Sequence, residues 1–69
     1  MSEVRTVRWI DSSIQNVQVG SEDFPRPARI VSIGFVVDET EEYVTLARDD
    51  HGDGEWRGLV AIPKIAILE

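Results

Sequence analysis

The stretch that decides the fold is ARIVSIGFVVD, residues 28–38. It is rich in β-branched and aromatic residues, which favour a strand. Its apolar residues fall on both alternating faces: we assign one face to the core, with Val31, Ile33, Phe35 and Val37, and the other to Ile30 and Val36. A strand that is apolar on both sides is typical of one that is covered on both sides. Gly34 interrupts the run, as glycine does where a small sheet bends or carries a bulge.

Strand-like segments flank this stretch on both sides. Residues 4–10 (VRTVRWI) place Val7 and Trp9 on one face, and residues 42–48 (EYVTLAR) place Val44 and Leu46 together. Such alternation is typical of half-buried strands. The segment WRGLVAI predicts a fourth strand over residues 56–62. Pro63 ends it because proline cannot donate to a ladder, and after a tight turn a short fifth strand is expected over residues 65–68.

The first connection is long and irregular. Residues 11–27 contain Gly20, Pro25 and Pro27, which punctuate loops. One helical turn could follow Asp11 or Ser12 as its N-cap. We expect the loop to be pinned over the core by its apolar residues, Ile14, Val17, Val19 and Phe24. Five strands with a long first loop and a tight turn before the last strand predict an all-β fold, a small SH3-like barrel. OB and Sm barrels remain open, because sequence predicts strands better than their closure.

Length and composition bound the function. A chain of 69 residues and 7.8 kDa makes a single domain over residues 1–69 with one small core, and leaves no room for a second lobe to form an active-site cleft. The absence of cysteine suits a reducing cytoplasm and excludes disulfides and thiolate zinc sites. The N-terminal residues MSEVRTVRWID lack the apolar run of a signal peptide, and no run elsewhere has the length of a membrane span, so neither is expected. The expected location is therefore the cytoplasm.

The segment RDDHGDGEW, residues 48–56, contains the single histidine and a cluster of acids. It lies where a hairpin loop is needed, and its glycines and aspartates are ordinary turn formers. A calcium loop of the EF-hand type requires glutamate at its twelfth position, counted here from Asp49. That position is Val60, and His51 is a poor ligand for a hard cation. We therefore interpret the segment as a turn and expect neither metal nor cofactor.

Three stretches resemble one group of proteins: WIDSS at residues 9–13, ARIVSIGFVVDET at residues 28–40 and VAIPKIAI at residues 60–67. The group consists of short proteins encoded by tailed phages and prophages. Its members begin with an aromatic, aliphatic, Asp-Ser stretch and end in an aliphatic-Pro segment. The resemblance covers most of the chain apart from residues 14–24 and the acidic hairpin. It implies a phage origin and a small β fold, hence residence in the host cytoplasm, and it carries over no functional residue because the group has no assigned activity.

An enzyme is not expected, because His51 lies in a glycine-rich loop that would orient a catalytic base poorly. A protein-binding module of SH3 type would instead use an aromatic and acidic groove for a Pro-rich or basic peptide. The candidate partner-binding residues are Trp9, Tyr43, Trp56, Ile30 and Val36. Core packing is the competing interpretation for each aromatic.

Nucleic-acid binding by an Sm-like or OB-like barrel is the alternative. It would use the cluster Arg5, Arg8, Arg26 and Arg29. The formal net charge of −6 opposes it, because affinity for nucleic acid comes from neutralising phosphates. A protein partner is therefore favoured over nucleic acid.

A homodimer or larger oligomer is also expected. The hydrophobic content of 42% exceeds what one small core would cover, and large exposed apolar patches are rare in monomers. Association through a strand edge, or through the face of Ile30 and Val36, would bury the surplus. The competing interpretation is that the long first loop covers this face.

Overall fold

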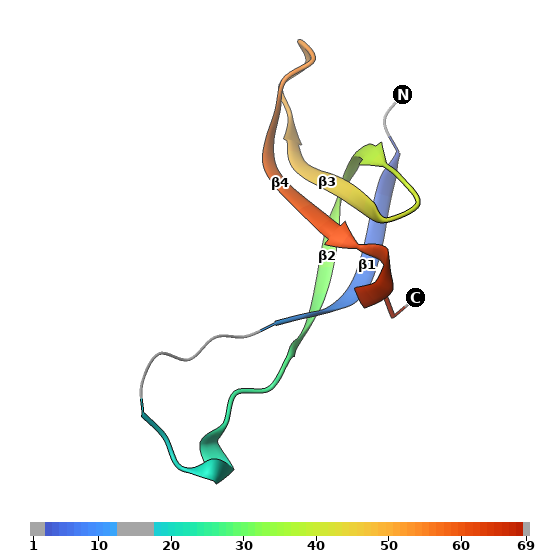
Figure 1. The fold of residues 1–69 in the computed structure, drawn as a ribbon. Helices are drawn as coiled ribbons and strands as arrows, with labels where there is room; N and C mark the ends of the chain where they lie inside the picture. The colour runs from blue at the N-terminus through green and yellow to red at the C-terminus, as the bar shows by residue number, and fades with distance from the viewer. Residues whose placement is uncertain (1–2, 13–17, 69) are drawn as a thin grey trace.

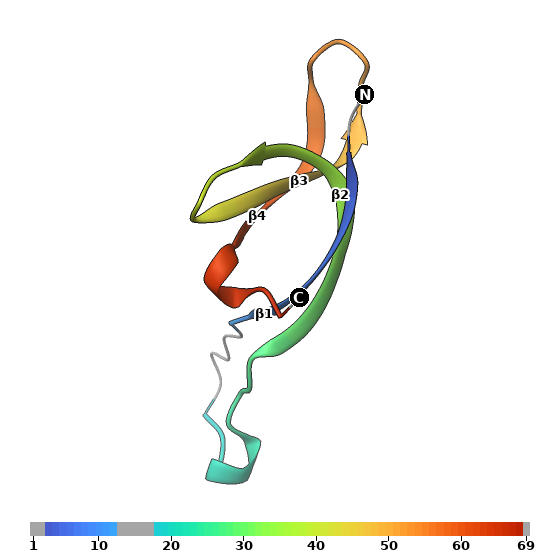
Figure 2. The ribbon, with the colours of Figure 1, turned by 90° about the vertical axis from the view of Figure 1, so that its right-hand side faces the viewer.

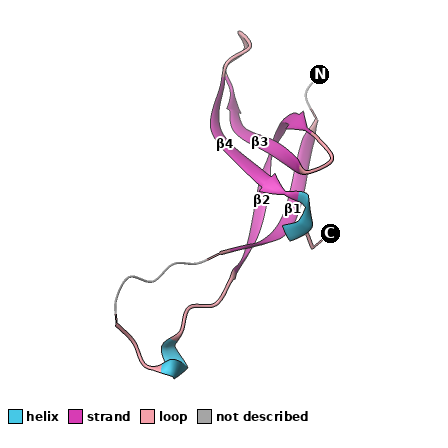
Figure 3. Ribbon diagram, viewed as in Figure 1, coloured by secondary structure: helices cyan, strands magenta, loops and turns pink. Residues whose placement is uncertain are grey.

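A computed structural model of the chain describes residues 3–12 and 18–68. The fold is all-β, as the sequence predicts. One antiparallel sheet holds four strands in the order β1-β2-β3-β4 (Figure 1). Their bounds are β1 Val4–Asp11, β2 Ala28–Glu39, β3 Tyr43–Asp50 and β4 Trp56–Pro63. The described residues contain no α-helix, and the helical segments in Figure 3 are two 3-10 turns, η1 Ser21–Asp23 and η2 Lys64–Ala66.

The core lies on the concave inner face of this curved sheet. Val7 and Trp9 from β1 meet Val44 and Leu46 from β3 and Ile62 from β4. The predicted alternation of β1 and β3 is thus confirmed. Val44, Leu46 and Ile62 are at most 1% exposed. Because each fully buried aliphatic side chain stabilises the fold by roughly 1.5–3 kcal/mol, these few residues account for much of the apolar driving force.

The long strand β2 belongs to two ladders in succession. Its first part pairs with β1, from Ala28 opposite Asp11 to Phe35 opposite Val4. Its second part pairs with β3 from Phe35 onward, and the register shifts between Val36 and Asp38. Figure 2 shows β2 as a continuous arc that carries β3 and β4 across from β1. The irregularity expected at Gly34 therefore lies slightly later in the strand, where a bulge increases the local twist.

Gly34 has a different role from the expected bend. It is buried on the inner face, and a Cβ at this position would lie 2.6 Å from the carbonyl oxygen of Ala47 and 3.2 Å from the Cβ of Leu46. No real Cβ sits that close to a backbone oxygen. The missing side chain is what lets β3 approach β2 at the point where the ladders exchange.

The faces of β2 are the reverse of those assigned from the sequence. Across the β1–β2 ladder, Trp9 stands opposite Ile30 and Val7 opposite Ser32, and Ile30 and Val36 pack against the core. Val31 and Ile33 instead lie on the outer face and are 59% and 65% exposed. The polar Ser32 is tolerated on the inner side because its Oγ accepts a hydrogen bond of 3.0 Å from Trp9 Nε1.

The expected fifth strand is not formed. Residues 64–66 make the 3-10 turn η2, and Ile67 forms one isolated bridge with Trp9. The amide of Leu68 donates to the carbonyl of Arg8 at 2.8 Å. The sheet is therefore four-stranded and open among the described residues, rather than a closed five-stranded barrel. The tight turn expected after Pro63 is present as η2. Because residues 64–66 form this turn, they cannot pair with β1 as part of a fifth strand.

Residues 18–27, which lead into β2, project from the sheet (Figure 1), and the structure is 49 Å along its longest axis. They contain η1, and Phe24 is 61% exposed. Phe24 therefore does not cover the core as expected, whereas Val19 is half-buried. Ile14, Val17 and the helical turn expected after Asp11 or Ser12 fall on residues outside the described ones.

Adding one methyl group at Gly34 tests the close approach of β2 and β3. Gly34→Ala should lower the free energy of unfolding by about 1–3 kcal/mol, because the new Cβ forces backbone apart. Gly20→Ala is the matched control, since no atom lies within 4 Å of its added Cβ. Urea denaturation of both variants measures the difference. Equal stability of the two would contradict the steric role of Gly34.

Candidate functional site

The three predicted aromatic residues have different environments. Trp9 is part of the core and only 7% exposed. Tyr43 is half-buried at the start of β3, and its hydroxyl is 3.3 Å from Asp38 Oδ2. Trp56 is half-buried, and its ring lies against Phe35, with centroids 5.8 Å apart and planes tilted by 51°. Ile30 and Val36 also pack against the core. Of the five predicted partner-binding residues, Tyr43 and Trp56 are therefore the two that do not belong to the core or pack against it.

The four arginines of the predicted cluster also lie in different environments. Arg5 is held by two carboxylates: Glu3, with Nε to Oε2 at 2.8 Å, and Glu39, with Nη1 to Oε2 at 3.1 Å. A second pair of hydrogen bonds makes each contact bidentate. Lys64 of η2 reaches the same Glu39 at 3.0 Å. These ion pairs join β1, the end of β2 and η2 at the rim of the inner face, so Arg5 serves the fold rather than an open binding surface.

The charges of this network shift the pKa values of its members. Hydrogen bonds from Arg5 and then Lys64 lower the pKa of Glu39 from 4.5 to about 2. Hydrogen bonds to Glu3 and Glu39 raise the pKa of Arg5. In each case the charged form is favoured by an oppositely charged partner in direct contact. The folded state therefore favours the ionised form of Glu39.

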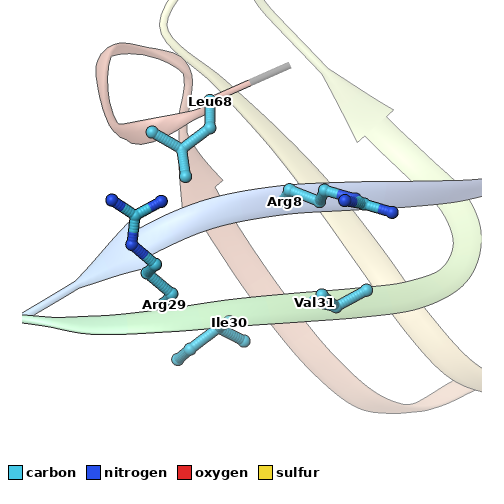
Figure 4. Close-up of a pocket in the computed structure, with 5 residues that line it drawn as sticks. All are labelled: Arg8, Arg29, Ile30, Val31 and Leu68. Atoms are coloured by element: carbon cyan, nitrogen blue, oxygen red, sulfur yellow. The ribbon is translucent and has the colours of Figure 1, made fainter.

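Arg8 and Arg29 lie together elsewhere, on the outer face of the β1–β2 ladder. They line a pocket of about 360 Å³ with Ile30, Val31 and Leu68. Figure 4 shows the side chains of Arg29 and Leu68 extending toward one another, while Ile30 points to the opposite side. Arg26 lies before β2, in the exposed segment that leads into it. The structure thus joins two of the four predicted arginines in one site.

The outer face also presents aliphatic side chains. Val4, Phe35, Ala47 and Leu59 form one row across the four strands. Four outer-face residues are between 59% and 65% exposed: Val4, Val31, Ile33 and Leu59. Large apolar side chains exposed together on one face are a feature of interaction sites in soluble proteins.

The acidic hairpin has the turn structure that the sequence predicts. Gly52 and Gly54 have positive φ values of 80° and 84°. Asp50 Oδ1 accepts from the amide of Gly52 at 2.8 Å, and Asp53 Oδ1 accepts from the amide of Glu55 at 3.2 Å. Both aspartates therefore serve the loop's own backbone. Within residues 3–12 and 18–68, no three acidic or histidine side chains are grouped so that they could hold a metal ion.

Sequence reasoning missed Val31, Ile33 and Leu68 as surface residues. The first two were assigned to the core, and Leu68 to a fifth strand. The register explains the error, since Leu68, Arg8 and Val31 become neighbours only through the bridge at Ile67 and the β1–β2 pairing. The alternation of Arg8 with Val7 and Trp9 was a usable signal, because it places Arg8 opposite the core.

Stability below pH 4.5 tests the role of Glu39. Its folded pKa of about 2 lies below its ordinary value, so its contribution is complete above pH 4.5 and is lost as the pH falls toward 2. Glu39→Gln should therefore be less stable than wild type at pH 6, and the difference should vanish near pH 2. Urea titrations over this range measure it, with Glu22→Gln as the control for the loss of one exposed carboxylate. A difference that does not change with pH would contradict the ion-pair account.

Comparison with known proteins adds no relative. No family model matches the chain, and no curated protein or solved structure matches it significantly. None of the helical segments described is long and apolar enough to cross a membrane. A functional assignment therefore has to rest on the geometry of the outer face and its pocket.

Proposed function

We propose that this chain is a small, non-enzymatic protein of phage type that acts as a protein–protein interaction module. The observation that carries the proposal is the outer face, where Val4, Val31, Ile33 and Leu59 are each at least 59% exposed. Leaving these side chains in water forgoes roughly 1.5–3 kcal/mol for each one that a partner would bury. A phage origin and a location in the host cytoplasm belong to the same proposal and are supported by the resemblance of three stretches of the sequence.

The finer fold that we propose is SH3-like. It is supported by the order of elements: a long first loop, a β2 shared between two ladders, a hairpin, and a 3-10 turn at residues 64–66 that returns the chain to β1. In this arrangement the single bridge between Ile67 and Trp9 stands where a fifth strand would close the barrel.

Nucleic-acid binding has less support. The guanidinium of Arg5 is engaged by Glu3 and Glu39, and the arginines that line one pocket together are Arg8 and Arg29. Two phosphate contacts provide little affinity, and the formal net charge of −6 repels the remaining backbone. The exposed hydrophobic residues of the outer face, Val4, Val31, Ile33 and Leu59, are aliphatic, whereas modules for single-stranded nucleic acid use aromatic stacking platforms.

Self-association is proposed at a strand edge. The second edge of β4 has no ladder partner among the described residues, and exposed strand edges pair readily with other chains. Pro63 lies at the end of this strand and weakens pairing there, but Leu59 remains 60% exposed near its middle. The alternative face of Ile30 and Val36 is not available, because both residues pack on the core.

The interaction proposal is tested by capture from host cytoplasm with immobilised protein. Ile33→Asp should reduce capture of a specific partner at least tenfold, because a carboxylate replaces a side chain that the interface would bury. Phe24→Ser is the matched control, since Phe24 is equally exposed but lies on the projecting loop. Unchanged capture by a folded Ile33→Asp variant would overturn the proposal.

Sedimentation equilibrium over a wide concentration range tests self-association through the edge of β4. Wild type should have a mass that rises above 7.8 kDa with concentration, and Leu59→Lys should remain monomeric because a charged lysine on an edge strand opposes pairing. A wild-type mass that stays at 7.8 kDa throughout contradicts self-association.

A further inference from the structure

The outer face of the β1–β2 ladder has no second layer over it. Its large exposed side chains are aliphatic: Val4, Val31 and Ile33 are each at least 59% exposed, as is Leu59 at the same end of the face as Val4. In Figure 2 no described element lies over the convex side of this ladder, whereas β3, β4 and η2 lie on its concave side. The solvated face of an antiparallel sheet commonly carries polar residues. An aliphatic face of this kind is typical of one that another layer covers.

The core on the inner face is small for the length of the chain. Among the described residues, the buried hydrophobic side chains are Val7, Trp9, Val44, Leu46, Ala47 and Ile62. The accessible surface is 5559 Å², which is about 1,200 Å² more than a compact monomer of this mass exposes. A standard interface removes about 800 Å² from each partner. The surplus, which the projecting residues 18–27 share with the outer face, is therefore of the size that one dimer interface buries.

We propose that the outer face is the interface of a symmetric dimer, in which a second copy of the chain supplies the missing layer. This inference rests on the proposed function, because it identifies the partner that the interaction face takes. The two-fold axis lies between the two sheets and runs across the strands over Ile33, the most exposed aliphatic residue of the β1–β2 ladder. In such a dimer Ile33 faces its own counterpart, and the two ends of the face meet each other.

The two ends of the face are complementary under this axis. Val4 protrudes at one end, and the pocket of about 360 Å³ lies beside Val31 and Leu68 at the other. The axis places Val4 of each copy over the pocket of the other. The pocket wall contributes the apolar stems of Arg8 and Arg29, because long charged side chains bury their stems while their charged groups bind elsewhere. The inference requires only these stems, and not the guanidinium groups.

The chemistry of the face favours a second copy over a different protein or a nucleic acid. The residues that dominate binding between different proteins are enriched in tryptophan, tyrosine and arginine, whereas the exposed hydrophobic residues here are valine, isoleucine and leucine. Interfaces that resemble a divided core are typical of homodimers. The formal net charge of −6 opposes a nucleic acid. Edge pairing of β4 uses backbone groups at a different place and would join such dimers into larger assemblies.

Isotope-filtered NMR of wild type tests the interface directly. An equimolar mixture of ¹³C-labelled and unlabelled protein should show contacts between copies that join the methyl groups of Ile33 to each other and those of Val4 to Val31. Pairing at the edge of β4 would instead join backbone groups of residues 57–61. Contacts between copies that are confined to this edge overturn the inference, and so does a mass that stays at 7.8 kDa at every concentration.

A pair of charge variants at Ile33 tests the two-fold axis. Ile33→Asp and Ile33→Lys should each dimerise at least tenfold more weakly than wild type, because each places like charges against one another. Their equimolar mixture should recover a dimer that contains one copy of each. Phe24→Ser is the matched control, since Phe24 is 61% exposed on the projecting residues, and it should dimerise as wild type does. Sedimentation equilibrium measures all four samples.

The variants also distinguish the face from the edge. Ile33 lies on β2, which has a partner strand on both sides, so edge pairing alone predicts that Ile33→Asp associates like wild type. That result overturns the inference, as does a mixture of folded variants that stays monomeric. Variants that fold only when mixed support it, as their amide spectra would show. If the variants do not fold even when mixed, the labelled wild type decides.

Partner capture separates this inference from the proposed function. If wild type is monomeric and Ile33→Asp abolishes capture of a different protein, the interaction module stands and the second copy is wrong. If wild type is monomeric and Ile33→Asp leaves capture unchanged, both are wrong. A dimer whose contacts between copies run through Ile33 supports both.

Discussion

The fold depends on a close contact between two strands at Gly34. Strand β2 pairs with β1 up to Phe35 and with β3 from Phe35 onward. Where the partners exchange, the carbonyl of Ala47 occupies the space that a side chain at Gly34 would need. This contact brings Leu46 beneath Val36 and directs β3 and β4 across the inner face. The inner residues of β1, above all Trp9, then find partners on strands distant in the sequence. Without this contact, the inner residues of β1 and β2 would lack the partners that β3 and β4 provide.

The sequence predicted the all-β class, the four strands and the inner residues of β1 and β3. Those strands have polar residues on one side, such as Thr6 and Arg8, so alternation identifies their faces. On β2 both sides are apolar, and the larger aliphatic residues favoured the wrong one. The core side carries Ser32 and Gly34, each for a specific reason: Ser32 accepts a hydrogen bond from Trp9, and Gly34 leaves room for Ala47. Neither reason is visible before β1 and β3 are placed beside β2.

The candidate site was harder to predict for the same reason. The sequence showed that four arginines lie near one another, but not that they are placed on different faces of the sheet. Arg5 and Arg8 are three residues apart and therefore occupy opposite faces of β1. One is engaged by Glu3 and Glu39 at the rim, and the other lines the outer pocket with Leu68. Since Leu68 reaches that pocket only after the 3-10 turn, no local pattern could associate it with Arg29.

The C-terminal segment is held at its start by Lys64, which pairs with Glu39, and by Ala66 and Ile67, which pack against the core. Beyond these contacts, one bridge at Ile67 and one amide bond from Leu68 hold it beside β1, while Ile65 is almost fully exposed. Short terminal segments without a continuous ladder open at a fraction of the global unfolding free energy. Opening would uncover the edge of β1 next to Trp9 and remove one wall of the pocket at the same time. The order of the last few residues and the occupancy of the pocket are therefore thermodynamically linked, so that a ligand resting on Leu68 would also slow hydrogen exchange along the edge of β1.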